Sequence, residues 1–96
     1  MLYIVNKKGE VLKDCVERLT SHDVILLIED AVFAAVKTSP SSVVSTLASD
    51  ISVYALRADM KARGLDAQRC YERIQYVDYA GFVELVENNK PVRSCF

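Results

Sequence analysis

Three cysteines are the residues of this chain whose type and spacing point to chemistry. Cys15, Cys70 and Cys95 are an odd number at wide spacing, whereas secreted domains held by disulfides carry paired cysteines. We therefore expect free thiols in a reducing compartment, which places the protein in the cytoplasm. His22 is the only histidine, so nucleophiles that need a histidine base have little support. The remaining chemistry is that of a thiol that acts by itself or with a partner protein.

Composition argues against other kinds of site. No two cysteines have CxxC spacing and there is one histidine, so no metal site is expected. The three glycines are separated from one another and form no phosphate-binding loop, and no cofactor is expected. The 12 Lys and Arg balance 13 Asp and Glu at a formal net charge of -1, so direct binding of nucleic acid is not expected. The longest apolar run, residues 31–36, is far shorter than the roughly 20 residues that span a bilayer, so no membrane segment is expected.

Cys15 lies in a pattern typical of an amphipathic helix. Apolar residues recur at helical spacing between Val11 and Leu19, and charged residues occupy the other face. At about 100° per residue, Cys15 falls inside the apolar arc. Free cysteine packs as a small hydrophobe, so core packing and a sulfur-carrying thiol both remain open interpretations.

Cys95 is the weaker candidate for a sulfur-carrying thiol. It is the penultimate residue, beyond Pro91, on a terminus that we expect to be loose and therefore accessible. The positive charge of Arg93 nearby favours a thiolate. Cys70 follows Arg69 in a setting that favours no particular role, and we assign it none.

Short apolar strands alternate with helices along the chain. The predicted strands are residues 2–5, 24–28, 51–56 and 74–77. The predicted helices are residues 11–19, a segment from Ala31, a short piece around residues 43–47, residues 57–64, a short helix after Asp66 and a last helix from Asp78 to about Asn88. Asp30, Asp66 and Asp78 each precede a predicted helix and can cap it by accepting a backbone N–H. The pattern predicts one α/β domain over residues 1–96, with a small, open, mainly parallel sheet and helices on both faces.

The segment 31–36 also predicts an interface. Its residues are all apolar and cover every direction around a helix. One side can pack on the sheet, but a chain of 96 residues has little structure left to cover the other side. We expect Val32, Phe33 and Val36 to contact a neighbouring subunit, which makes the isolated chain prone to self-association.

Three blocks of sequence together resemble one family. They are residues 29–35 (EDAVFAA), residues 53–65 (VYALRADMKARGL) and residues 77–83 (VDYAGFV). From Leu2 to about Leu85 the chain resembles the DsrH/TusB family of bacterial sulfur-relay subunits, and residues 53–65 are the most specific part. The resemblance implies a DsrE-like fold and a hetero-hexamer with TusC/DsrF-like and TusD/DsrE-like subunits.

The resemblance implies two alternative roles. A TusB-like chain is a non-enzymatic subunit that helps to pass persulfide sulfur toward 2-thiolation of wobble uridine in transfer RNA. A DsrH-like chain handles sulfur in sulfur oxidation and carries a cysteine on its first helix, which Cys15 matches. In the Tus relay the essential thiol belongs to the D-type subunit. We expect the TusB-like role, with a Cys15 persulfide carrier and an inert assembly subunit as alternatives.

Overall fold

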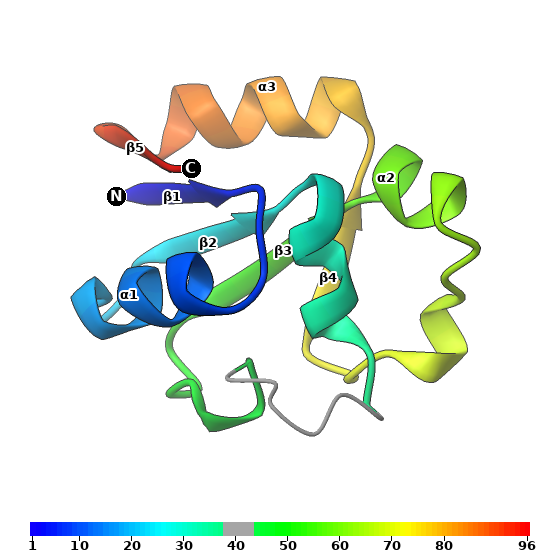
Figure 1. Cartoon of the computed structure of the whole chain (residues 1–96). Coiled ribbons are helices and arrows are strands. Elements are labelled where there is room, and N and C mark those ends of the chain that lie inside the picture. The colour runs from blue at the N-terminus through cyan, green and yellow to red at the C-terminus, as the bar shows by residue number, and fades with distance from the viewer. Residues whose placement is uncertain (38–43) are drawn as a thin grey trace.

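Five parallel strands form one sheet in the part of the chain that the computed structural model describes, residues 1–37 and 44–96. The strands are β1 (Leu2–Val5), β2 (Val24–Leu27), β3 (Ser52–Leu56), β4 (Ile74–Val77) and β5 (Val92–Cys95). Their order across the sheet is β4-β3-β2-β1-β5, and every neighbouring pair is parallel (Figure 1). The predicted α/β class with a mainly parallel sheet is therefore confirmed.

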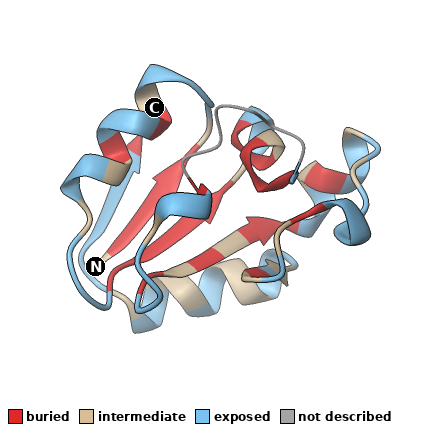
Figure 2. Ribbon diagram, turned by 90° about the horizontal axis from the view of Figure 1, so that it is seen from below, coloured by how far each residue is buried: buried red, intermediate tan, exposed pale blue. Residues whose placement is uncertain are grey.

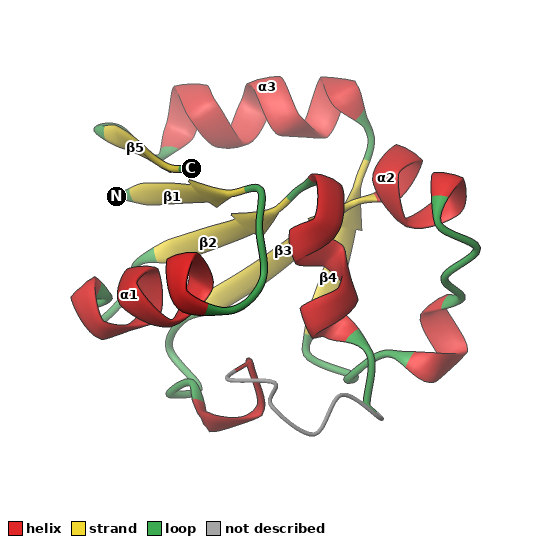
Figure 3. Ribbon diagram, viewed as in Figure 1, coloured by secondary structure: helices red, strands yellow, loops and turns green. Residues whose placement is uncertain are grey.

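Helices cover both faces of this sheet, as predicted. The helix α1 (Glu10–Arg18) and the 3-10 helix η1 (Glu29–Ala35) lie on one face, and α3 (Tyr79–Asn88) lies on the other (Figure 3). The helix α2 (Arg57–Ala62) follows β3 and contacts η1. Two short 3-10 helices are η2 (Val44–Thr46) and η3 (Ala67–Arg69). After β4, the chain returns through α3 and adds β5 beside β1, at the opposite edge of the sheet.

The alternation of side chains along the strands divides the core into two layers. On the face covered by α1 and η1, Tyr3 and Val5 join the larger buried cluster. On the face covered by α3, Leu2 and Ile4 join a smaller one. The strands β1 and β2 are buried on both faces (Figure 2), which is why their sequences are unbroken apolar runs.

The segment 31–36 departs from the predicted α-helix. Its residues up to Ala35 belong to the 3-10 helix η1, which begins at Glu29, and Val36 follows this helix in an extended conformation. Glu29 has a positive φ of 50°, and its backbone N–H donates to the Asp59 carboxylate at 2.6 Å. Asp30 forms an ion pair with Arg63 at 3.0 Å instead of capping the helix. The predicted Asp30 cap is wrong. Contacts with Asp59 of α2 and with Arg63, the residue that follows α2, determine the conformation of this turn.

Burial within the chain removes the basis on which an interface was predicted at Val32 and Val36. Val32 is fully buried because η1 packs against β2, β3 and α2, and Val36, which follows η1 and forms a β-bridge with Cys70, is 7% exposed. Phe33 remains partly exposed, and the ammonium of Lys8 lies 5.3 Å from its ring centroid. The argument from an uncovered apolar helix is therefore wrong for Val32 and Val36. Of the three predicted interface residues, Phe33 alone keeps an accessible surface.

The two other predicted caps are confirmed. The Asp66 side chain accepts the backbone N–H of Gln68 at 2.9 Å, and Asp78 accepts that of Gly81 at 2.8 Å. The short helix predicted around residues 43–47 forms as η2 from Val44, and Val43 lies outside the described residues. These elements support the strands that follow them without contributing side chains to the thiol site described below.

The C-terminal residues form the edge strand β5, which was not predicted. It pairs with β1 from Val92 to Cys95, and the backbone N–H of Leu2 donates to the carbonyl of Pro91 at 3.1 Å. All residues of β5 except Cys95 are exposed, so the strand lacks the apolar pattern that marks the others. The expectation of a loose terminus with an accessible Cys95 is therefore wrong.

Candidate functional site

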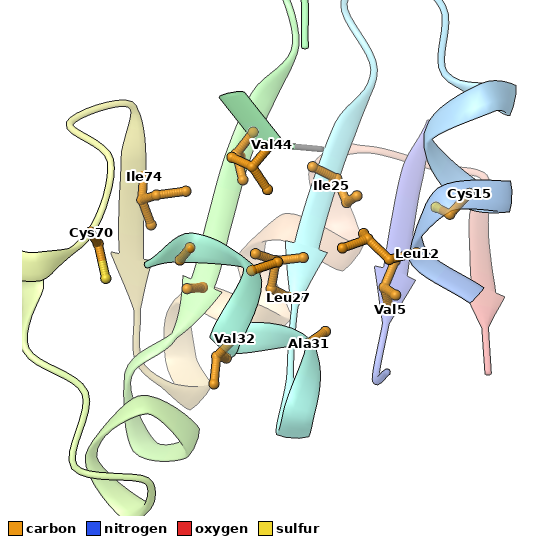
Figure 4. Close-up of a cluster of buried hydrophobic side chains, with 14 of the residues drawn as sticks. Val5, Leu12, Cys15, Ile25, Leu27, Ala31, Val32, Val44, Cys70 and Ile74 are labelled. Carbon is orange, nitrogen blue, oxygen red and sulfur yellow. The ribbon is translucent and has the colours of Figure 1, made fainter. Parts of the chain in front are cut away.

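The helix α1 presents Cys15 to the sheet. Gly9 has a φ of 84°, a conformation that favours glycine, and it ends the loop between β1 and α1. Glu10 in the first turn and Arg18 in the last turn both complement the helix dipole. Leu12 and Cys15 are the buried residues of this helix, and Figure 4 shows both at the α1 end of the core cluster. Cys15 is 1% exposed, which confirms its place in the apolar arc.

The strand β5 brings Cys95 to the same place. Cys95 is in register with Val5 of β1, and both side chains belong to the cluster on the α1 face of the sheet. Cys95 is 8% exposed, whereas the three residues before it in β5 are exposed. Cys95 is thus the inward-facing residue of an otherwise exposed edge strand.

Cys15 and Cys95 form a thiol pair. Both residues are free cysteines, and the neighbouring Cys95 thiol is among the groups that raise the pKa of Cys15. The pair shares an open cavity of about 200 Å³. The rest of its lining comes from α1 and the C-terminal end of the chain: Val11, Asp14, Arg18, Ser94 and Phe96. The two cysteines are far apart in sequence, and only the unpredicted pairing of β5 with β1 brings them together.

Burial controls the reactivity of the Cys15 thiol. It raises the pKa of Cys15 far above the ordinary value of 9.0, and the neighbouring Cys95 raises it further. The positive charge of Arg18 acts in the opposite direction. Because the thiolate is the nucleophilic form, Cys15 is a weak nucleophile at neutral pH while this packing is intact.

Cys70 lies at the opposite end of the same core cluster (Figure 4). It is 2% exposed, and its thiol donates to the backbone carbonyl of Asp66 at 3.5 Å. Burial raises the pKa of Cys70, and a hydrogen bond with Tyr76 acts against this change. Burial, together with Cys70, raises the pKa of Tyr76 to about 12. Cys70 is therefore packed between a backbone carbonyl and a phenol, a setting that again favours no chemical role.

Other polar groups of the chain support the fold. The Arg73 guanidinium donates to the backbone carbonyls of Leu47, Ala48 and Ile51 at 2.6 to 2.8 Å, which fixes the loop before β3. Within residues 1–37 and 44–96, no group of three His, Cys, Asp or Glu side chains could hold a metal ion. No helix of these residues is both long enough and apolar enough to cross a bilayer. The thiol pair combines a reactive group with space beside it.

Comparison with solved structures identifies the fold. Protein Tm0979 from Thermotoga maritima, determined by NMR, has a TM-score of 0.66 and 26% identity, over 95% of this chain and 97% of that one. A protein of unknown function from Methanobacterium thermoautotrophicum has a TM-score of 0.72 at 12% identity, over 97% and 96% of the two chains. The second likeness concerns the fold alone.

Comparison with known sequences identifies the family. The family described as DsrH like protein matches residues 7–92. Protein TusB of Photorhabdus laumondii is 36% identical over 67 residues, which are 70% of this chain and 68% of that protein. Protein TusB of Erwinia tasmaniensis is 37% identical over 71 residues, which are 74% and 73% of the two chains. The chain therefore belongs to the DsrH family, whose TusB-like members are subunits of sulfur relays.

Proposed function

We propose that this chain is a non-enzymatic, TusB-like subunit of a cytoplasmic sulfur relay that passes persulfide sulfur toward 2-thiolation of wobble uridine in transfer RNA. The observation that carries the proposal is the identity of 36% and 37% to two proteins named TusB. A net charge of -1 suits a subunit that does not itself grip RNA. The deep burial of Cys15 suits a subunit that does not itself attack a substrate.

The proposed partners are TusC/DsrF-like and TusD/DsrE-like subunits in a hetero-hexamer. Exposed apolar side chains on α3 offer surface for such contacts. Tyr79 and Val83 lie one turn apart on this helix and are 64% and 55% exposed. Phe33 on the other face of the sheet is a further candidate. In this assembly the D-type subunit carries the essential thiol, and the present chain supports it.

A second candidate function is that of a DsrH-like sulfur carrier, with Cys15 as the persulfide site and Cys95 as the weaker candidate. The observation that favours it is the cavity shared by the two thiols, since a persulfide needs room for an additional sulfur atom. Because burial raises the pKa of Cys15, this function requires the packing between α1 and β5 to open during transfer.

Complementation of a deletion strain separates the two functions. The 2-thiouridine content of transfer RNA is measured in a strain without this chain and after return of the wild type, Cys15→Ala or Cys70→Ala, at matched protein levels. The supporting role predicts loss of 2-thiouridine in the deletion strain and recovery with all three proteins. Recovery with Cys70→Ala but not with Cys15→Ala would favour the carrier. An unchanged 2-thiouridine content in the deletion strain would contradict a role in transfer RNA thiolation.

A further inference from the structure

The two thiols in the cavity between α1 and β5 differ in how they reach solvent. Cys95 is the less deeply buried of the two, and it is the last residue of an edge strand whose other side chains are exposed. A short, exposed edge strand of this kind opens locally at low free-energy cost. Cys15 is held in the middle of a helix, against the sheet. A small molecule that enters the cavity therefore reaches Cys95 first.

We propose that Cys95 accepts sulfane sulfur from a small-molecule persulfide, and that Cys15 is the resolving thiol that expels this sulfur as hydrogen sulfide and closes a Cys15–Cys95 disulfide. The inference rests on the proposed function only in taking a persulfide as the source of sulfur. To that function it adds a residue that accepts the sulfur and a reaction that releases it as hydrogen sulfide. Neither the partner subunits nor transfer RNA take part in these steps.

The atoms and electrons balance in both steps. First, the Cys95 thiolate attacks the terminal sulfur of the donor, R–S–SH. The bond between the two donor sulfurs breaks, the donor leaves as the thiolate R–S⁻, and Cys95 becomes Cys95–S–SH. Second, the Cys15 sulfur attacks the Cys95 sulfur, and the terminal sulfur leaves as H₂S with the Cys15 proton. The Cys15 sulfur is oxidised and the departing sulfur is reduced, so the persulfide is the only oxidant required.

The geometry of the cavity supports these steps. Cys15 and Cys95 line the same cavity, which places the two thiols near each other, as a disulfide between them requires. A cavity of about 200 Å³ leaves room for the additional sulfur atom on Cys95. Arg18 lines the same cavity, and its positive charge favours the anionic form of the Cys15 sulfur, which attacks in the second step. Cys70, at the other end of the core, has a phenol and a carbonyl as its neighbours.

Mass spectrometry of the isolated full-length chain tests the proposal, with glutathione persulfide as the probe. The reduced protein is treated with the probe without oxygen, remaining thiols are alkylated, and released sulfide is measured. The wild type is expected to lose the mass of two hydrogen atoms and to release one sulfide per chain. Digestion without reduction is expected to yield a cross-linked peptide pair that contains Cys15 and Cys95.

Three variants make the result specific. Cys15→Ala is expected to retain one added sulfur atom on Cys95 and to release no sulfide. Cys95→Ala is expected to lose both the added sulfur and the disulfide. Cys70→Ala is the matched control, because Cys70 is buried to a similar extent but lies at the other end of the core cluster. It is expected to behave as the wild type.

Two results would overturn the proposal. A wild type that keeps the added sulfur without forming the disulfide would exclude Cys15 as the resolving thiol. Sulfur uptake by Cys95→Ala at the level of the wild type would exclude Cys95 as the acceptor. If Cys15→Ala does not fold by circular dichroism, Cys15→Val fills the site and replaces it. If the chain forms the disulfide but does not restore 2-thiouridine in the deletion strain, this inference holds and the proposed function is excluded. If the chain restores 2-thiouridine but forms no disulfide, the proposed function holds and this inference is excluded.

Discussion

The two ends of the larger core cluster bury a cysteine in different ways. At the α1–β5 end, Cys15 faces a second thiol and an open cavity. At the η1–η3 end, Cys70 forms an antiparallel bridge with Val36, and the backbone N–H of Tyr71 donates to the carbonyl of Ala35 at 3.0 Å. Similar burial therefore does not mean similar chemistry, because Cys15 has a partner thiol and space, whereas Cys70 has a backbone carbonyl and a phenol as its neighbours.

The elements that close the two ends explain this difference. The α1–β5 end is closed by a short edge strand that pairs with β1 along one side. The η1–η3 end is closed by two chain segments tied together by backbone hydrogen bonds, among them the one from Lys37 to Arg69 at 2.8 Å. Local opening requires the loss of fewer contacts at an edge strand, so we expect thiol reactions at the α1–β5 end.

A charge placed at the η1–η3 end is expected to change the free energy of unfolding more than any other substitution considered below. Val36→Glu buries an unpaired carboxylate and should cost about 3–5 kcal/mol of the free energy of unfolding, measured in urea. Phe33→Glu, in the same segment, is the matched control and should cost far less, because Phe33 is partly exposed. A Val36→Glu variant as stable as the wild type would show that this end is as easily opened as the other.

A disulfide at the α1–β5 end is expected to have the next largest effect, in the opposite direction. The Cys15–Cys95 bond closes a loop of about 80 residues and should stabilise the chain by about 2–4 kcal/mol. The melting temperature of the oxidised wild type should therefore exceed that of the reduced form, and oxidised Cys95→Ala should show no increase. An equal increase in Cys95→Ala would place the effect elsewhere in the chain.

Serine substitutions at the two ends should lower the free energy of unfolding by different amounts, and this difference is smaller than the two effects above. Cys15→Ser places a hydroxyl in an apolar arc and should cost about 1–3 kcal/mol, and Cys15→Val should disturb the packing less. Cys70→Ser should cost less than Cys15→Ser, because the Asp66 carbonyl and Tyr76 can bond a hydroxyl. Urea unfolding of the reduced proteins gives these differences. The reverse order would contradict the contrast between the two environments.

The smallest expected effect is a dependence of stability on pH. The folded chain raises the pKa of both Cys15 and Cys70 above the ordinary value of 9.0. The folded state therefore holds these protons more tightly, so their stabilisation is complete below pH 9.0 and is lost as the pH rises above it. Cys15→Ala should flatten this decline in the urea midpoint. A decline that is equally steep in Cys15→Ala would show that other groups cause it.

The sequence was sufficient to predict the parts of the fold in which local pattern and burial agree. The strand ranges 2–5 and 74–77 match the structure, because the first is an apolar run buried along its length and the second begins at the buried Ile74. The helix with Cys15 was predicted for the same reason. Asp66 and Asp78 were predicted as caps because they accept local backbone N–H groups.

The thiol site was only half predictable. β5 carries exposed residues along an edge, and its pairing with β1 depends on contacts between the two ends of the chain. Cys95 was therefore considered without its neighbour Cys15. Residues 31–36 show the same limit, because an unbroken apolar run does not say whether α2 or another subunit covers it. Both features depend on tertiary contacts, which the spacing of residues does not contain.

Transfer of labelled sulfur in a reconstituted complex tests the relay role most directly. The chain is combined with its TusC/DsrF-like and TusD/DsrE-like partners and a donor that carries labelled persulfide sulfur. The relay role predicts that the three proteins form one complex and that labelled sulfur reaches transfer RNA only when this chain is present. A chain that remains apart from its partners, with transfer unchanged by its absence, would contradict the relay role.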